Sequence, residues 1–392
     1  MPENLYLIVS FTVSFLVVFY AIPRISLISI KKKLYAIPNE RTASQKIIPN
    51  LGGVGIFAGI FIGTVCSLKG MNADKIIELL LCALVMFFIG LQDDTIGLSA
   101  KKKLIAQIAV AVYLITICNI RFTNLHGILG LYEINYLSSF LITLISIVGL
   151  VNAFNLIDGI DGLAAGLGTL ISATFGFLFL YFGEIEFTLL SFSITGGLIS
   201  FFFYNVFGTK NKIFMGDTGS LTLGVLFAGL TISLNEITPT QHVFNKDWAS
   251  PAITMAIMII PVIDSIRVMF IRISQGRSPF SADMSHIHHQ LIKITNKNHL
   301  QATIIMVVAN LFFIVFSFGV IEQLGTNLLF FTLLLAGFTL AYVPFLINKK
   351  RETEEESKNV MDNAEEQYFQ IIHSIKKPPV VKKEVEEEEL VS

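Results

Sequence analysis

The chain has 392 residues, of which 53% are hydrophobic and only 15% are charged. A soluble domain carries about a quarter charged residues, and here the apolar residues are gathered in long blocks instead of alternating with polar ones. The composition excludes an ordinary soluble enzyme and predicts an all-α polytopic membrane protein. The formal net charge of −1 excludes no class of partner, because the charges are segregated along the chain. The three cysteines, Cys66, Cys82 and Cys118, lack a metal-binding spacing and are interpreted as packing residues.

Apolar blocks follow one another along the chain and predict about eleven transmembrane helices. Most of them reach the roughly 17–25 residues that a membrane-spanning helix needs. They lie near residues 5–23, 51–68, 76–92, 104–120, 137–153, 163–182, 187–206, 218–234, 251–270, 302–321 and 327–347. The first block has no basic residue before it and Arg24 directly after it, which is the reverse of a cleavable signal peptide. It predicts a retained helix whose amino end lies outside.

The basic residues predict the orientation of the helices. With the amino terminus outside, the inner connections and adjoining helix ends hold sixteen Lys and Arg, and the outer connections hold four. This bias places the carboxyl-terminal end in the cytoplasm. Residues 1–348 then form the integral membrane domain. Residues 349–392 have mixed charge and a Pro-Pro pair, and they predict a cytoplasmic tail that is mostly disordered, with at most a short helix near 361–375.

Polar residues gather at the predicted inner ends of the helices, in four clusters. These are "QDDTIGLSAKKK" (92–103), "NAFNLIDGIDGLAAG" (152–166), "YNVFGTKNKIFMGDTGSL" (204–221) and "GRSPFSADMSHIHHQ" (276–290). The outer loops hold no such concentration. A channel needs polar lining through the whole membrane, whereas an enzyme with a cytosolic substrate needs polar groups on one face. The pattern therefore predicts an active site at the cytoplasmic face.

The aspartates of these clusters point to a cation. Asp93 and Asp94 are adjacent, and Asp158, Asp161 and Asp217 lie at other inner helix ends. A lone pair of aspartates at a helix end is more simply a helix cap neutralised by the lysines that follow. Five carboxylates on one face need a cation to converge, and their hard oxygens favour Mg²⁺ or Mn²⁺.

The second cluster repeats a polar residue every three positions. If this stretch is helical, the repeat forms one stripe, made of Asn152, Asn155, Asp158 and Asp161. Gly159 and Gly162 are unfavourable inside a helix and favour a bend or a close approach of another group. A polar seam between two helices is the alternative interpretation.

The third and fourth clusters add groups that suit an anion. Asp217 precedes an apolar helix, so it either caps that helix or lies beside a phosphate held at the helix amino end. His286, His288 and His289 lie within four residues without the usual partners of a zinc site. Together with Arg277 they predict hydrogen bonds to a diphosphate, the alternative being a solvated loop. His126, His242, His299 and His373 lack such a context.

With these clusters in this order, the chain resembles the polyprenyl-phosphate N-acetylhexosamine-1-phosphate transferases over about residues 1–320. The resemblance is carried by "GLQDDTIGL", "NAFNLIDGIDGLAAG", "FMGDTGSL" and "GRSPFSADMSHIHHQL". It implies transfer of a sugar 1-phosphate from a UDP-sugar to a lipid phosphate, with release of UMP and a requirement for Mg²⁺. The implied partners are these two substrates and membrane lipid, without nucleic acid, and a homodimer is compatible with it.

The resemblance also implies a role for each matching residue. Asp93 is the base that deprotonates the lipid phosphate or, in an older interpretation, the covalent nucleophile. Asp158 is required, in a role that stays open. The implied metal ligands are Asp94 and Asp217; the implied uridine contacts are Asn155, Asp161 and Phe214; the implied nucleotide contact is Lys46; and the implied diphosphate neighbours are His286, His288 and His289.

Two details bear on the sugar. "HIHH" after "GRSPFSAD" resembles the GlcNAc branch, because the pentapeptide branch carries a run of consecutive histidines. Met284 departs from relatives that often carry a basic residue there. The implied function is the first membrane step of cell-envelope polysaccharide synthesis in a bacterial inner membrane, from UDP-GlcNAc and undecaprenyl phosphate. The alternatives are another UDP-N-acetylhexosamine (GalNAc, a modified sugar or MurNAc-pentapeptide) and a non-catalytic transporter, which predicts charged residues at mid-membrane that the blocks hardly show.

Overall fold

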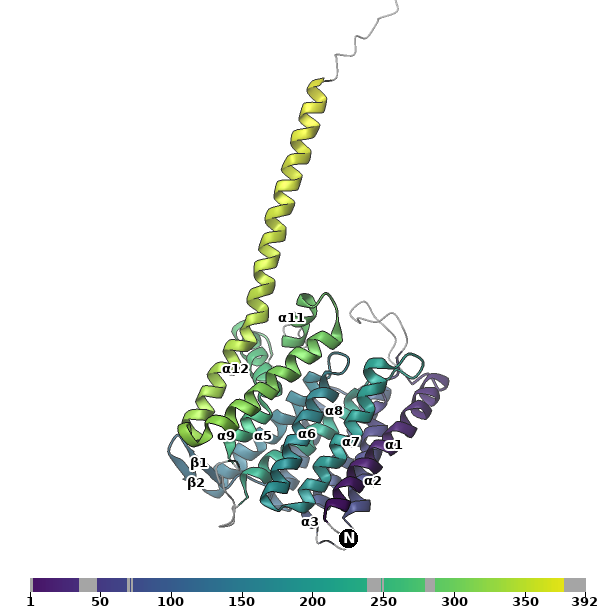
Figure 1. The fold of residues 1–392 in the computed structure, drawn as a ribbon, viewed down its shortest axis with the longest axis vertical. Coiled ribbons are helices and arrows are strands. Elements are labelled where there is room, and N and C mark those ends of the chain that lie inside the picture. The colour runs from purple at the N-terminus through teal and green to yellow at the C-terminus, as the bar shows by residue number, and fades with distance from the viewer. Residues whose placement is uncertain are drawn as a thin grey trace, which may run out of the picture. The chain divides into compact units, whose positions relative to one another are not determined.

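The computed structural model describes residues 3–34, 48–68, 71, 73–237, 248, 250–278 and 286–376. The chain forms two units, Met1–Pro344 and Phe345–Ser392 (Figure 1). The first unit is a helix bundle that holds the predicted active site, and the second is the tail. The predicted division at residues 348 and 349 lies close to the boundary between the units and stays a prediction.

The described residues are almost entirely helical. The helices are α1 (Glu3–Lys31), α2 (Gly52–Ser67), α3 (Asp74–Ile96), α4 (Ala100–Thr116), α5 (Tyr136–Ile157), α6 (Leu163–Phe182), α7 (Ile185–Phe207), α8 (Gly216–Asn235), α9 (Pro251–Ile257), α10 (Ile259–Ser274), α11 (Ile287–Ile294) and α12 (His299–Lys376). The one sheet in the described part of the chain is an antiparallel hairpin, β1 (Asn124–Ile128) and β2 (Leu131–Glu133). The predicted all-α class is confirmed.

Every predicted apolar block falls on a helix, but the blocks and the helices do not match one to one. Block 251–270 falls on α9 and α10, which are bent by 83°. The last two blocks both lie in α12, which breaks at Gly325 with a φ of 67°. By length and composition the described residues hold 7 candidate spans, or 8 if the bent pair is one span. A multi-pass membrane protein is confirmed, and the number eleven stays a prediction.

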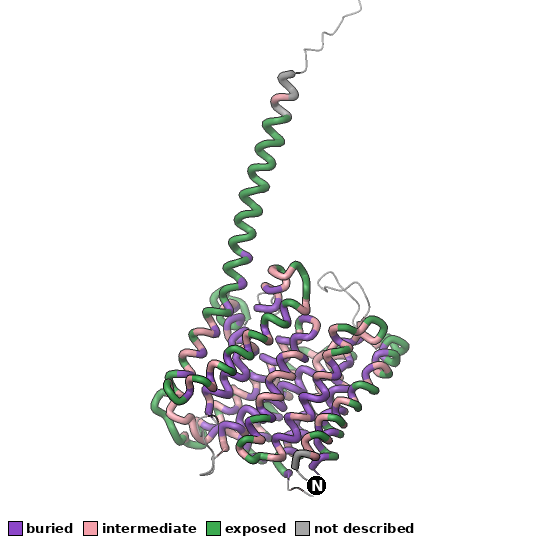
Figure 2. Tube along the Cα trace, viewed as in Figure 1, coloured by how far each residue is buried: buried purple, intermediate pink, exposed green. Residues whose placement is uncertain are grey.

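Helix α8 is the most buried of the candidate membrane spans in the described residues, and the active-site end of the bundle is built around it. It packs against α3, α5 and α2, while α1 packs against α2 and α7. A Cβ at Gly224 would lie 2.7 Å from the Cα of Val151 on α5, so a glycine is needed for this close approach. Buried residues accordingly gather inside the bundle (Figure 2).

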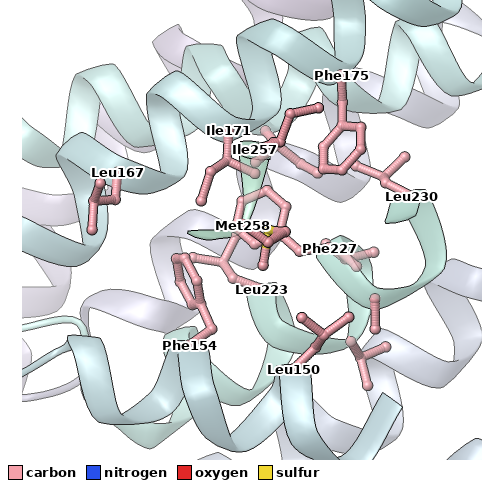
Figure 3. Close-up of a cluster of buried hydrophobic side chains, with 14 of the residues drawn as sticks. Leu150, Phe154, Leu167, Ile171, Phe175, Leu223, Phe227, Leu230, Ile257 and Met258 are labelled. Atoms are coloured by element: carbon pink, nitrogen blue, oxygen red, sulfur yellow. The ribbon is translucent and has the colours of Figure 1, made fainter. Parts of the chain in front are cut away.

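Aromatic and aliphatic side chains from α5, α6, α8 and α9 form a packed core beside α8. Figure 3 shows Phe154 and Phe227 together with Phe175 and Met258; the rings of Phe154 and Phe227 meet edge-on, with centroids 4.8 Å apart. Offset or edge-on aromatic pairs of this kind stabilise a core beyond their buried area. The core fixes α5 and α8 relative to each other, and both helices carry active-site residues at their ends.

The tail differs from the expected disorder. Helix α12 continues past Pro344 to Lys376, and its described side chains from Arg351 to Phe369 are exposed. The segment 349–376 contains no glycine or proline, and it is rich in the strong helix formers Glu and Lys. An ion pair of 3.8 Å joins Lys350 to Glu354 one turn on. These residues favour helix where mixed charge was interpreted as disorder. Residues 377–392 lie outside the described part.

Candidate active site

The first three polar clusters meet at one end of the bundle. Hydrogen bonds join the end of α3 to the start of α8, the start of α4 to both, and the end of α5 to α8. These segments lie far apart in the sequence. They meet because their helix ends lie at the same end of the bundle, as predicted. Helix α11 and the hairpin β1–β2 lie at opposite ends of the bundle (Figure 1), so the two ends differ in character.

Asp94, near the end of α3, caps the amino end of α8. Its Oδ1 accepts hydrogen bonds from the N–H of Asp217 (3.0 Å) and from Nδ2 of Asn50 (3.1 Å). Its Oδ2 accepts from the N–H (2.9 Å) and Oγ1 (2.6 Å) of Thr218. A carboxylate here satisfies helix N–H groups and lies at the positive end of the helix dipole. The capping interpretation therefore holds for Asp94, although the helix it caps is α8 and not its neighbour in sequence.

Asp93 and Asp217 face one cation, the ammonium of Lys103. The Nζ atom lies 3.2 Å from Oδ2 of Asp93 and 2.8 Å from Oδ2 of Asp217. The other oxygens accept hydrogen bonds from the N–H of Leu98 (2.6 Å) and from Nδ2 of Asn155 (3.0 Å). We call Asp93, Lys103 and Asp217 the carboxylate cluster. All three side chains are partly exposed, so a ligand can reach them.

The donor set of this cluster fits Mg²⁺. Among the described residues, no three His, Cys, Asp or Glu side chains have the geometry of a metal site. Mg²⁺ usually takes one or two protein carboxylates and completes its shell with water and phosphate. Asp93 and Asp217 already direct one oxygen each at a common cation, whereas each oxygen of Asp94 accepts two hydrogen bonds. The geometry favours Asp93 and Asp217 for direct contact, with Asp94 behind them as support.

The polar stripe on α5 ends where the helix ends, at Ile157. Asn155 donates hydrogen bonds to Asp217 (3.0 Å) and to Oγ of Ser220 (2.8 Å), which joins it to the carboxylate cluster. Asn152 instead pairs with Gln107 on α4, its Nδ2 donating at 2.7 Å. Asn152 and Asn155 both lie on α5, as the predicted helical stripe requires. Asn152 takes part in a polar seam between α5 and α4, which was the alternative interpretation.

The chain turns between α5 and α6, in a segment that we call the polar loop (Asp158–Gly162). Gly162 has a φ of 80°, a conformation that side-chain-bearing residues rarely adopt, and it precedes α6. Asp158 ends α5 and is half-buried. Loss of hydration, together with the nearby charges of Asp217 and Asp94, raises the pKa of Asp158 well above its usual value.

Asp161, in the polar loop, is held by a lysine and a histidine. Nζ of Lys212 lies 2.6 Å and Nδ1 of His299 3.3 Å from its Oδ2. Burial alone would raise the pKa of Asp161, but hydrogen bonds from His299 and Lys212 hold it below its usual value. An open cleft of about 510 Å³ adjoins it, lined by Asp161, Asn296, Lys297, Asn298 and His299. This cleft offers amide, ammonium and carboxylate groups to a polar ligand.

The histidine segment (His286–His289) reaches the polar loop. A Cβ at Gly159 would lie 2.2 Å from Nε2 of His288, so the imidazole packs directly on the glycine backbone. His286 and His288 are buried and His289 is half-buried. Burial lowers the pKa of His288 to about 3 and keeps it neutral. The fourth cluster thus joins the site, with two of its three histidines inside the protein.

Comparison with known proteins identifies the family. The profile of glycosyl transferase family 4 matches residues 76–235. The undecaprenyl-phosphate alpha-N-acetylglucosaminyl 1-phosphate transferase of Salmonella typhimurium is 32% identical over 273 residues, 68% of this chain and 71% of the relative. A probable undecaprenyl-phosphate N-acetylglucosaminyl 1-phosphate transferase of Bacillus subtilis is 31% identical over 309 residues, 78% of this chain and 83% of the relative. The chain belongs to glycosyl transferase family 4.

The family assignment confirms the resemblance on which the sequence interpretation depended. The range matched by the family profile contains the carboxylate cluster and the polar loop, and it ends before the histidine segment. Phe214 lies within it and is half-buried; its N–H donates to the carbonyl of Pro49 (2.8 Å) and its carbonyl accepts from Gly52 (2.9 Å). Arg277 is exposed after α10, its N–H donating to the carbonyl of Arg272 (2.9 Å). Lys46 and Met284 lie outside the described residues.

The structure places several residues at the site that the sequence alone did not indicate. Lys103 was one of three consecutive lysines, and nothing in "KKK" indicates which one faces the aspartates. His299 and Lys212 have no local motif, since their contact with Asp161 is long-range. Asp264 had a signal that went unused, because an ionisable residue within a predicted span is by itself a functional hypothesis.

Proposed function

We propose that this protein transfers N-acetylglucosamine 1-phosphate from UDP-GlcNAc to undecaprenyl phosphate, giving undecaprenyl-diphosphate-GlcNAc and UMP. The names of relatives at 31–32% identity support this donor and this acceptor. The observation that carries the proposal is the convergence of Asp93 and Asp217 on one cation, at a position that solvent reaches. Phosphoryl transfer depends on such positioning and charge neutralisation more than on covalent groups from the protein.

In the proposed reaction an oxygen of the lipid phosphate attacks the sugar-linked phosphorus. A new P–O bond forms, and the P–O bond to UMP breaks. Asp93 takes the proton of the lipid phosphate, and Lys103 balances the charge of the two carboxylates. Mg²⁺, when bound by Asp217 with Asp93 or the predicted Asp94, supplies positive charge to the diphosphate oxygens. The covalent alternative uses the same Asp93 carboxylate as nucleophile.

The remaining predicted residues divide between the two halves of the donor. Asn155, Asp161 and Phe214 are proposed to hold the uridine, since Asp161 opens on the polar cleft described above. Lys46 is proposed to contact the nucleotide, and Arg277 and the histidine segment are proposed to lie near the diphosphate. The bacterial relatives support a bacterial inner membrane, and the positive-inside bias supports an orientation with this end of the bundle and the tail in the cytoplasm.

Release of UMP by the purified full-length protein in detergent tests the proposal. The reaction contains UDP-GlcNAc, undecaprenyl phosphate and Mg²⁺, and the controls omit the lipid or add EDTA. Lipid- and metal-dependent release that disappears with Asp217→Asn supports the reaction. Release only from UDP-GalNAc or UDP-MurNAc-pentapeptide keeps the chemistry and changes the sugar. No release with any UDP-sugar contradicts the proposal and favours a non-catalytic membrane protein of this fold.

A further inference from the structure

Asp264, in the middle of α10, is almost fully buried and is bonded to the start of the histidine segment. Its Oδ2 lies 3.0 Å from Nδ1 of His286, and its Oδ1 accepts the N–H of Ile287 at 2.9 Å. The guanidinium of Arg267 lies 3.2 Å from the same Oδ1. One carboxylate therefore contacts both the imidazole of His286 and the backbone N–H of Ile287, the residue that begins α11.

The second ring nitrogen of His286 also has a neighbour. Its Nε2 lies 3.4 Å from a guanidinium nitrogen of Arg272. A guanidinium only donates hydrogen bonds and a carboxylate only accepts them, so this arrangement fits a neutral imidazole protonated on Nδ1. With only 3% of its surface exposed, His286 has both nitrogens directed at protein groups and none at a ligand.

The position of the whole histidine segment depends on this contact. Ile287 is the first residue of α11, and His288 and His289 follow in its first turn. His288 lies against Gly159 of the polar loop, and its ring contacts that of His289 at a tilt of 48°, with centroids 4.2 Å apart. A displacement of His286 from Asp264 would move α11 and change how His288 meets the polar loop.

We propose that Asp264 is a positioning residue of the active site, which acts through His286 and contacts no substrate itself. By holding Nδ1 of His286 and the N–H of Ile287, it sets the start of α11 and so the placement of His288 beside the polar loop. The proposal assigns His286 to this positioning pair, not to the groups that bind the diphosphate. It rests on the proposed function, because the polar loop and the histidines are taken to serve that reaction.

A double-mutant cycle with Asp264→Asn and His286→Gln tests the proposal in the UMP-release assay. Loss of a residue that orients a functional group typically lowers activity about 10–100-fold, and we expect each single variant to lower kcat by this factor. The KM for UDP-GlcNAc should change little. The double variant should lose no more than the worse single variant, because the two residues act as one unit. An unchanged kcat for Asp264→Asn, or losses that multiply in the double variant, would overturn the proposal.

Two controls separate positioning from simple destabilisation. Asn310 is also buried beside α10: its Nδ2 donates to the carbonyl of Ile257 (3.1 Å) and its Oδ1 accepts the N–H of Ile260 (3.4 Å). Asn310→Leu should lower the unfolding temperature as Asp264→Asn does and should keep kcat. A loss of kcat in Asn310→Leu equal to that in Asp264→Asn would contradict a specific role for Asp264.

The second control needs no folded Asp264 variant. The chain has 7 histidines, so selective ¹⁵N-histidine labelling of the wild-type protein gives few NMR signals, and His286→Gln assigns the one that disappears. We expect His286 in the neutral form protonated on Nδ1. A proton on Nε2 alone would overturn the proposal. If the wild-type protein releases no UMP, the proposed function fails, and this tautomer measurement still decides whether Asp264 holds His286.

Discussion

Two aspartate–cation clusters at the same end of the bundle differ in one respect, their access to solvent. In the carboxylate cluster the side chains of Asp93 and Asp217 are 17% and 24% exposed, whereas Asp264 and its cationic partner Arg267 are 1% and 6% exposed. A partly exposed ion pair can exchange its partners for those of a ligand, but breaking a buried one leaves an uncompensated charge. The first cluster is therefore suited to chemistry and the second to geometry.

Removing the base should have the largest effect of any single change in the carboxylate cluster. General acid–base catalysis contributes roughly 10²–10⁴-fold, and we expect Asp93→Asn to lower kcat for UMP release by this factor. The unfolding temperature in detergent should change little, because the Asp93 side chain is partly exposed and accepts its hydrogen bonds from Leu98 and Lys103 near the protein surface. A kcat within tenfold of wild type would show that Asp93 is not the base of the reaction.

Lys103→Gln comes next. The substitution leaves two carboxylates facing each other without their shared ammonium, and loss of one preorganised charge-stabilising group costs on the order of 10²-fold in kcat. Lys102→Gln is the matched control, since Lys102 is the exposed neighbour in the same lysine run. Equal activity of the two variants would show that the lysine run contributes only general positive charge. Lys103 would then have no specific role between the two carboxylates.

Asp94 should separate stability from chemistry within the adjacent pair. Asp94→Ala leaves the N–H groups of Asp217 and Thr218 at the start of α8 without their acceptor. Loss of a helix cap costs about 0.5–2 kcal/mol of folding free energy, so the unfolding temperature should fall below that of Asp93→Ala. Activity should fall as well, because Asp217 lies in the first turn of α8 and would be displaced with it. Equal unfolding temperatures for the two variants would contradict the capping role.

The fold class, the shared end of the polar clusters and the two aspartates of the carboxylate cluster could be read from the sequence, because each depends on local pattern. Long apolar blocks require helices, and adjacent Asp93 and Asp94 stand at a helix end whatever the tertiary structure. The partners of these groups could not be read. That Asp94 caps α8 depends on packing between helices 123 residues apart in the chain. That His286 is buried depends on Asp264, which looks like an isolated residue in an apolar block.

The contact between the polar loop and the histidine segment is tested by Gly159→Ala. The new methyl group would lie 2.2 Å from Nε2 of His288, so the polar loop or the histidine segment has to move. We expect kcat to fall, by less than the roughly 100-fold that a misplacement of 1 Å can cost. Gly149→Ala on α5 is the control, since its Cβ meets no described atom within 4 Å. If both variants keep full activity, the packing of His288 on the polar loop is not needed for the reaction.

Removal of the tail should have the smallest effect. A chain that ends at Asn348 keeps every residue proposed to act in catalysis or binding, and it loses the exposed helical segment with the residues beyond it. An exposed helix of mixed charge buries little apolar surface, so it adds little to the stability of the first unit. We expect the kcat for UMP release and the unfolding temperature to stay close to those of the full chain. A large loss of kcat at an unchanged unfolding temperature would mean that the tail takes part in the reaction, and the division between the catalytic residues 1–348 and the tail would then be wrong.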